Sequence, residues 1–359
     1  RNLSRMAWVR PAPWWDENRV TRHVSRAERI ERDARRLVLR DGTALPYDHL
    51  VLATGARPRH LQVPGFEHPA CLTLRTPEDS VRLFPALRPG AAVAVVGAGF
   101  IGLEVAAAAR AHGAAVTVLE VGKRVLSRGV PAEIAEWYRA LHAGQGVTLR
   151  LGAVVTRITD AEGRAVVHTE DGETVSADAV VTGIGVIPNV ELAEAAGLPV
   201  RNGIVVDEYA RTEDPAIWAA GDVTQHPNPI LGGTHRLESW QNAQNQAIAV
   251  ARNILGANKP YAEVPWFWSD QFGHNLQIAG EVGDGMETIG RGTPGQGAAL
   301  RFYLVDGVLR GAIGIDAARD LRFAKELIGV RARVAADALA DPGVTLAELL
   351  KQAKAAAAA

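Results

Sequence analysis

The stretch VAVVGAGFIGLEVAAAARAHGAAVTVLE, residues 93–120, constrains the fold of this chain more than any other segment. An apolar run at 93–96 is followed by a glycine-rich turn, an alanine-rich helical segment and a second apolar run, which predicts one βαβ unit. Gly97 allows a tight turn, Gly99 lets the backbone approach a pyrophosphate, and Gly102 lets helix and strand pack closely. The helix N-terminus would offer free N–H groups to phosphates. The segment therefore predicts a dinucleotide site, with a ligand-free βαβ crossover as the alternative.

Glu120 ends the second strand of this unit, 18 residues after Gly102. A carboxylate at this position can accept hydrogen bonds from both ribose hydroxyls of NAD. Against the 2′-phosphate of NADP, each pair of like charges about 4 Å apart costs about 4 kcal/mol at an effective dielectric of about 20. We therefore expect NADH to be preferred over NADPH, although Lys123 and Arg124 could soften that preference. The alternative is that Glu120 only caps the end of its strand.

Composition excludes several other classes of protein. With 359 residues the chain has room for two or three domains. A formal net charge of −1 argues against general binding to nucleic acids or membrane surfaces, and no apolar run reaches the roughly 18 residues of a transmembrane helix. The single cysteine, Cys71, excludes a CxxC redox pair, so a buried structural thiol in a reducing, cytoplasmic setting is expected. The ten histidines show no metal-ligand spacing, and His226 and His235, which flank a Pro/Gly loop, are expected at the surface.

Two further strand ends are not explained by one dinucleotide. ATGARPR (53–59) and TEDPAIWAAGD (212–222) each hold an apolar strand that ends in small residues beside a turn, where the backbone can approach a large flat ligand. LVLATGARP also resembles VVTGIGVIPN, which indicates two similar nucleotide-binding halves. Asp222 could accept a hydrogen bond from a ribityl hydroxyl of such a ligand. The alternative is that Asp222 is only a cap or turn residue.

The remaining pattern predicts an α/β chain with an α+β C-terminal domain. An Asp41-Gly42 hairpin turn precedes a buried strand at 50–53, and Thr76-Pro77-Glu78 opens a helix. The predicted helices cover 76–89, 131–143, 238–256, 319–328 and 345–357. The predicted strands after the βαβ unit cover 147–151, 153–159, 164–169, 177–189, 275–280, 286–291, 299–305 and 308–315.

Eight motifs occur in an order that resembles one known family. They are LVLATGARPR, LRTPED, VVGAGFIGLEVA, GIGVIPN, NGIVVDE, IWAAGD, ESWQNAQNQ and PWFWSDQ. This chain is similar to FAD-dependent, NADH-dependent ferredoxin reductases, the reductase components of bacterial aromatic-ring dioxygenase and cytochrome P450 systems. The resemblance implies a glutathione-reductase-like fold, in which an NAD domain is inserted into an FAD domain. The expected ranges are 1–88 and 207–262 for the FAD-binding domain, 89–206 for the NAD-binding domain and 263–359 for the C-terminal reductase domain.

The resemblance assigns expected roles to matching residues. None of these residues is expected to act as a catalytic acid, base or nucleophile. Glu104 and Trp240 would lie near the nicotinamide and the flavin. The FAD-binding set would be Arg5, Ala27, Thr54, Gly55, Ala56, Arg75, Asp222 and Trp240. The NAD-binding set would be Gly97, Gly99, Ile101, Gly102, Glu104, Glu120 and Gly185.

Several of these residues have structural alternatives. Trp240 could be core packing, Arg75 could pair with Glu78 or Asp79, and Glu104 could simply be an acid in the first turn of a helix. Trp266 and Trp268 are expected to pack between domains. A basic run could meet an acidic partner or could be a solvated face; its members are Arg319, Arg322, Lys325, Arg331 and Arg333.

The family begins with its own strand–GxGxxG–helix unit, which this sequence lacks. NLSRM (2–6) would match the family's Pro-Leu-Ser-Lys motif, with Arg5 at the position of a lysine that contacts the flavin. We therefore expect a truncated chain. Without that unit the FAD pyrophosphate loses a helix N-terminus, so we expect the chain as written to bind FAD poorly.

The implied activity is electron transfer from NADH through FAD to a small ferredoxin, most simply of the [2Fe–2S] type, that feeds an oxygenase. A monomer or weak dimer is expected, with no metal site, nucleic acid or membrane. Two alternatives remain open. One is another flavoenzyme of this fold, such as a rubredoxin or nitrite reductase component or an apoptosis-inducing-factor-like NADH oxidase. The other is a non-catalytic NAD-binding module.

Overall fold

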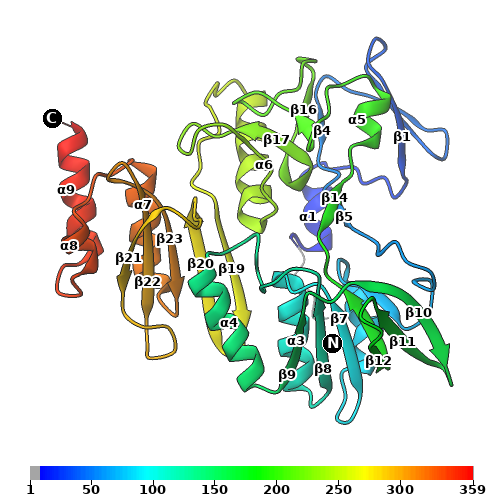
Figure 1. The fold of residues 1–359 in the computed structure, drawn as a ribbon. Coiled ribbons are helices and arrows are strands. Elements are labelled where there is room, and N and C mark those ends of the chain that lie inside the picture. Colours follow the sequence, from blue (N-terminus) through cyan, green and yellow to red (C-terminus); the bar gives the residue numbers. More distant parts are fainter. Residues whose placement is uncertain (1–8, 359) are drawn as a thin grey trace.

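The computed structural model describes residues 9–358 and arranges them in several α/β layers (Figure 1). Arg5 lies outside the described residues. Within the described range, no helix combines the length and apolar character that crossing a membrane requires. The helices are α1 (Ala12–Glu17), α2 (Pro77–Leu83), α3 (Phe100–Ala111), α4 (Ala132–Gly144), α5 (Glu191–Ala195), α6 (Trp240–Ile254), α7 (Ala318–Gly329), α8 (Ala336–Ala340) and α9 (Leu346–Ala358).

A five-stranded parallel sheet forms around the glycine-rich segment. Its strand order is β6-β13-β7-β8-β9. The helix α3 packs on β7 and β8, and α4 packs on β9. The edge strand β6 comes from before residue 89, so this sheet extends beyond the predicted boundary. The strands are β6 (Cys71–Thr73), β7 (Ala92–Val96), β8 (Ala115–Glu120), β9 (Val147–Leu151) and β13 (Ala179–Thr182). An antiparallel sheet of β10 (Val155–Ala161), β11 (Arg164–Thr169) and β12 (Thr174–Ala177) adjoins it.

Segments from either side of this sheet in the sequence pair with each other. Strand β4 (Leu50–Leu52) runs parallel to β16 (Ile217–Ala219), and β5 (Ala56–Pro58) runs antiparallel to β14 (Val186–Pro188). This pairing is what an inserted domain requires. Two small sheets complete the region: β1 (Ala27–Glu31), β2 (Arg36–Leu39) and β3 (Ala44–Pro46), then β15 (Ile204–Val205), β17 (Thr224–Pro227) and β18 (Thr234–His235).

The C-terminal part is an antiparallel sheet covered on both faces. Its strand order is β19-β20-β23-β22-β21. One face, with Leu300 and Phe302, packs under α7 and α9; the other, with Leu276 and Tyr303, joins the core of the parallel sheet. The alternating pattern of each strand supplies both faces. The strands are β19 (Trp266–Gln271), β20 (His274–Gly280), β21 (Glu287–Arg291), β22 (Ala299–Val305) and β23 (Val308–Ile315).

The structure corrects several sequence-based expectations. The helix expected over 76–89 ends at Leu83 and continues only as a 3₁₀ turn, η2 (Phe84–Ala86), because Pro85 has no N–H to donate to a carbonyl of the preceding turn. The segment 177–189 is two strands, not one. Three helices of five or six residues, α1, α5 and α8, were too short to show a helical period. His226 is buried, not at the surface, because it lies in β17 between β15 and β18 and its ring packs against Tyr261 at 5.5 Å.

Candidate functional site

The glycine-rich turn between β7 and α3 leaves no room for a Cβ at Gly97 or Gly102, whereas one at Gly99 would make ordinary contact. Gly97 has φ +102°, and a Cβ there would lie 2.6 Å from the Gly183 carbonyl oxygen. A Cβ on Gly102 would lie 2.0 Å from the Gly97 carbonyl oxygen. The N-cap residue Gly99 makes no side-chain cap, so the helix presents bare backbone N–H groups. These groups fit a pyrophosphate, and Ile101 lies exposed beside them.

Glu120 is held beside that turn by two backbone N–H groups. Its Oε2 accepts from the Ala98 N–H and its Oε1 from the Gly122 N–H, each at 2.7 Å. Each carboxylate oxygen keeps acceptor capacity, so the group can still bind two ribose hydroxyls. Arg124 donates to Asp284 at 2.8 Å, which holds its charge in an ion pair with the C-terminal part of the chain. The Arg124 charge is thus engaged by Asp284.

The turn that follows β4 is locked by one asparagine. Thr54 Oγ1 donates to the Asn189 carbonyl at 2.7 Å, and Asn189 Nδ2 donates to the Thr54 carbonyl at 2.8 Å. The Asn189 N–H also donates to the Gly55 carbonyl at 2.9 Å. Gly55 has φ +64°, a conformation that favours glycine. Ala56 is buried and lies opposite Pro188 in the β5–β14 pair.

Arg75 and Asp222 meet at this turn although 147 positions separate them. Arg75 Nη2 lies 3.3 Å from Asp222 Oδ2, and a Cβ on Gly55 would lie 3.5 Å from the same nitrogen. The expected alternative, an ion pair of Arg75 with Glu78 or Asp79, is wrong. Asp79 instead accepts from the backbone N–H groups of Arg75 and Thr76, as part of the capping box of α2.

The backbone that carries Asp222 is fixed by buried polar contacts. Gln246, fully buried in α6, accepts from the Gly221 N–H and from Thr224 Oγ1, both at 2.9 Å. Gly221 has φ +83° and begins the 3₁₀ turn η3 (Gly221–Val223), in which the Asp222 side chain is 15% exposed. These contacts hold the turn without using the Asp222 side chain.

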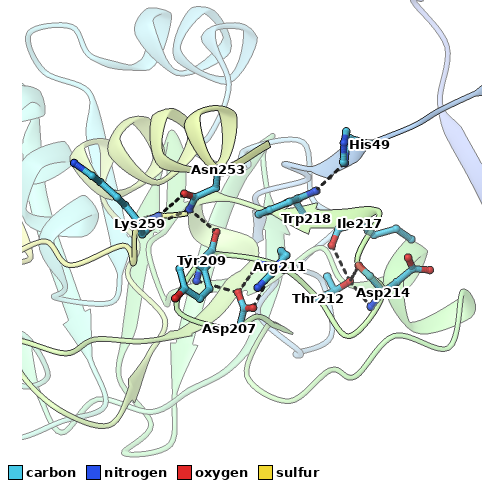
Figure 2. A network of polar contacts seen from close by, with 10 residues as sticks. All are labelled: His49, Asp207, Tyr209, Arg211, Thr212, Asp214, Ile217, Trp218, Asn253 and Lys259. Atoms are coloured by element: carbon cyan, nitrogen blue, oxygen red, sulfur yellow. Dashed lines mark hydrogen bonds and ion pairs between the residues drawn. The ribbon is translucent and has the colours of Figure 1, made fainter. Parts of the chain in front are cut away.

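The strand before that turn, β16, is anchored by the network in Figure 2. Asp207 accepts from the N–H groups of Tyr209 and Arg211 at 2.9 and 2.8 Å. Thr212 Oγ1 donates to the Ile217 carbonyl at 2.9 Å. The network thus fixes the loop that leads into β16, so the end of the strand has a defined position.

Trp240 is 67% exposed, so its reading as core packing is wrong. It begins α6, where Ser239 caps the helix by accepting from the Asn242 N–H. The Trp240 ring meets Trp268 edge-on at 6.3 Å, and Trp268 stacks on Trp266 at 5.1 Å. The three rings link α6 to β19, which agrees with the packing role expected for Trp266 and Trp268.

Glu104 faces β19 and not only the first turn of its own helix. Ser269 Oγ donates to Glu104 Oε1 at 2.5 Å. Burial raises the pKa of Glu104, the Ser269 hydrogen bond opposes that shift, and the nearby Asp270 charge adds to it. The side chain is therefore placed where two parts of the chain meet.

The other predicted site residues lie at different places. Gly185 has φ +100°, and its carbonyl accepts from the Arg59 N–H at 2.9 Å. The closer approach to the glycine-rich turn is made by Gly183, where a Cβ would lie 3.0 Å from the Gly102 nitrogen. Ala27 lies in a different sheet, opposite Leu39.

Sequence reasoning missed four residues of this arrangement. Asn189 and Gly183 belong to the GIGVIPN motif, which was the available signal. Gln246 lies in ESWQNAQNQ and Ser269 in PWFWSDQ. None of the four carries a charge or a pattern of its own that would have distinguished it from ordinary turn, helix or strand residues.

Cys71 is a free thiol, half-buried in β6 and not fully buried as expected. Burial, and secondly the Glu67 charge, raises its pKa to about 11. At neutral pH the group is a protonated thiol, which is a weak nucleophile. A protonated, half-buried thiol fits a structural role.

The fold and the paired glycine-lined turns define an oxidoreductase that uses a pyridine nucleotide. The model of the pyridine nucleotide-disulphide oxidoreductase family matches residues 16–247, and that of the reductase C-terminal domain matches residues 266–350. The chain belongs to this family, among its ferredoxin reductases. It has the family's fold, with a C-terminal reductase domain, as the resemblance implied.

Individual relatives are similar over most of their length. The chain is 46% identical over 347 residues to the ferredoxin–NAD(+) reductase component of the anthranilate 1,2-dioxygenase system of Burkholderia cepacia, covering 96% of this chain and 85% of that protein. A ferredoxin reductase from Rhodopseudomonas palustris is 40% identical, with a TM-score of 0.91 over 95% of this chain and 84% of that one. Putidaredoxin reductase, solved in a covalent complex with putidaredoxin, is 36% identical, with a TM-score of 0.91 over 97% and 85%.

Proposed function

We propose that this chain transfers electrons from NADH, through FAD, to a [2Fe–2S] ferredoxin that feeds an oxygenase. Bound FAD supplies the chemistry that accepts an electron pair from NADH and releases electrons singly. The carrying observation is the antiparallel pairing of β5 with β14, which brings the Gly55 turn to the strand that follows the 183–185 turn. The ranges proposed for the FAD, NAD and C-terminal domains fit this arrangement, with β6 added to the NAD sheet.

The residues of the two turns divide the work of binding. On one side Gly97, Gly99 and Gly102 would hold the NADH pyrophosphate, and Glu120 the adenosine ribose. Because two backbone N–H groups fix Glu120, little ordering of this side chain would be needed on binding. We propose NADH as the preferred donor for that reason and for its charge.

On the other side, Thr54, Gly55 and Ala56 would form the wall of the flavin site, with Asp222 oriented to a ribityl hydroxyl. Arg75 lies 3.3 Å from Asp222, so it neutralises that carboxylate next to a cofactor that itself carries phosphates. Trp240, exposed at the N-terminus of α6, would cover the ring system. These residues fit a flavin because Gly55 has no side chain to block it. The contacts that hold the 221–224 turn also do not involve the Asp222 carboxylate.

The basic run offers a surface for the partner. Arg319 and Arg322 on α7 are exposed, as are Arg331 and Arg333 just beyond it, and Arg333 also donates to the Asp306 carbonyl. An acidic ferredoxin would be steered to such a surface, in a small and short-lived complex. We further propose a monomer or weak dimer that works in the cytoplasm.

Anaerobic stopped-flow spectroscopy of the purified chain supplied with FAD tests the function. NADH should bleach the flavin absorbance, and a [2Fe–2S] ferredoxin should then be reduced much faster than O₂ or rubredoxin. The ferredoxin rate should fall as salt rises. A chain that binds NADH with no flavin reduction is only a binding module, and faster transfer to O₂ makes it an oxidase; either result overturns the proposal.

A further inference from the structure

We propose that a buried chain of hydrogen bonds from β19 and α4 holds the Glu104 carboxylate in place for the nicotinamide, with Ser269 as its positioning residue. The links run from His142 Nε2 to Gln271 Oε1 at 2.7 Å, from Gln271 Nε2 to Ser269 Oγ at 2.9 Å, and from Ser269 Oγ to Glu104 Oε1 at 2.5 Å. The inference rests on the proposed function, together with the expectation from the family resemblance that Glu104 lies near the nicotinamide.

Every donor in this chain of hydrogen bonds points toward Glu104. Ser269 has one proton, which it gives to the carboxylate, so its oxygen must accept from the Gln271 amide. The Gln271 carbonyl then faces His142, which must carry its proton on Nε2. The reverse orientation of Gln271 would need a second proton on Ser269 or a protonated Glu104. A charged Glu104 therefore fixes the orientation of every group behind it.

This chain of hydrogen bonds is shielded from water. Ser269 and Gln271 are each 1% exposed and His142 is fully buried. Burial lowers the pKa of His142, which keeps its ring neutral, and the unprotonated Nδ1 has no partner among the described residues. A buried polar chain gains little stability over apolar packing. Positioning Glu104, the half-buried carboxylate at the end of these hydrogen bonds, is a reason for their presence.

Strand β19 also packs an aromatic side chain against α3, the helix that carries Glu104. Phe267, Ser269 and Gln271 alternate along β19, so they share the face toward α3 and α4. Phe267 meets Phe100 of α3 edge-on at 4.5 Å. Glu104 lies one helical turn after Phe100, beside this aromatic contact. The motif PWFWSDQ thus carries two alternating functions, tryptophan packing on one face and orientation of Glu104 on the other.

The test uses the FAD-loaded enzyme and measures the dissociation constant of NAD⁺ by calorimetry together with kcat and KM for NADH, with ferricyanide as acceptor. Ser269→Ala should weaken NAD⁺ binding and raise KM about tenfold, the usual effect of losing a hydrogen bond to a charged group. Ser269→Thr, which keeps the hydroxyl, should restore most of the loss. The exposed strand serine variant Ser176→Ala is the matched control and should match the wild type.

A double-mutant cycle separates positioning from mere stability. If Ser269 acts through Glu104, Ser269→Ala added to Glu104→Gln should change NAD⁺ affinity no further, while an independent role would make the two effects add. If Ser269→Ala does not fold, the same cycle with Gln271→Leu decides. Additive effects, or an unchanged affinity in a folded Ser269→Ala, overturn the inference. A wild type that does not oxidise NADH would instead count against the proposed function.

Discussion

Thr54 and Asn189 exchange two hydrogen bonds across 135 positions of sequence, each side chain donating to the other residue's backbone carbonyl at 2.7 and 2.8 Å. This reciprocal pair closes the β5–β14 contact at the end where Gly55 has φ +64°. It joins the two motifs that resemble each other in the sequence. The Gly55 turn is therefore held by the 183–189 segment, which also approaches the glycine-rich turn at Gly97 and Gly102.

Removing this lock should loosen the flavin site. Asn189→Ala leaves the Thr54 carbonyl without its partner and Arg57 with only its ion pair to Glu191. It should weaken FAD binding about tenfold, since about 1.4 kcal/mol corresponds to one decade. Fluorescence titration of the apoprotein with FAD measures it. Asn202→Ala, at an exposed loop position, is the control. Equal affinities for the two variants would contradict the role given to Asn189.

The charge of Glu120 should set the choice of nucleotide. Glu120→Gln turns one acceptor into a donor that faces a backbone N–H, so both the ribose contact and the turn are weakened. We expect the ratio of kcat/KM for NADH over NADPH to fall about tenfold. Steady-state kinetics with both donors measure this ratio. The control variant Glu173→Gln, at an exposed position, should leave this ratio unchanged. If Glu120→Gln also leaves it unchanged, Glu120 only caps the end of its strand.

Gly102 should tolerate no side chain. A Cβ there would lie 2.0 Å from the Gly97 carbonyl, so Gly102→Ala must push α3 away from β7 and should cost about 2 kcal/mol of unfolding free energy. Gly144→Ala is the matched change, because nothing lies within 4 Å of its Cβ position at the end of α4. That variant should be neutral or slightly stabilising. Urea unfolding of both variants measures the difference. Equal midpoints would mean that the turn can rearrange to accept a side chain at Gly102.

His226 should make the fold sensitive to acid. Burial, with a smaller effect of the His235 charge, lowers its pKa from 6.5 to about 4, so between these values the folded chain binds fewer protons than the unfolded one. Stability is complete above pH 6.5 and is lost as pH falls toward 4, by about 3 kcal/mol at most. His226→Gln should flatten this slope in unfolding measured at pH 7 and pH 5. The exposed His60→Gln should keep the wild-type slope; an unchanged slope in His226→Gln would assign the acid sensitivity to other groups.

Much of the fold follows from local patterns in the sequence. The strands at 299–305 and 308–315 were predicted with the bounds that the structure gives, and the βαβ unit around Gly97 was predicted in full. Alternation, helical period and glycine turns act over a few residues, so they can be read without knowing the rest of the chain. The roles of individual site residues stay predictions, although Thr54, Gly55, Arg75 and Asp222 do come together.

The sequence by itself determined the dinucleotide fingerprint, the acid at Glu120 and the family to which the motifs point. Only the tertiary structure decided that Arg75 turns to Asp222 and not to its helix neighbours, that β6 joins the parallel sheet, and that Ser269 reaches Glu104. The Arg75–Asp222 and Ser269–Glu104 pairs join residues 147 and 165 positions apart. Such contacts depend on which strands pair and which faces pack, and no local period or turn signal encodes that choice.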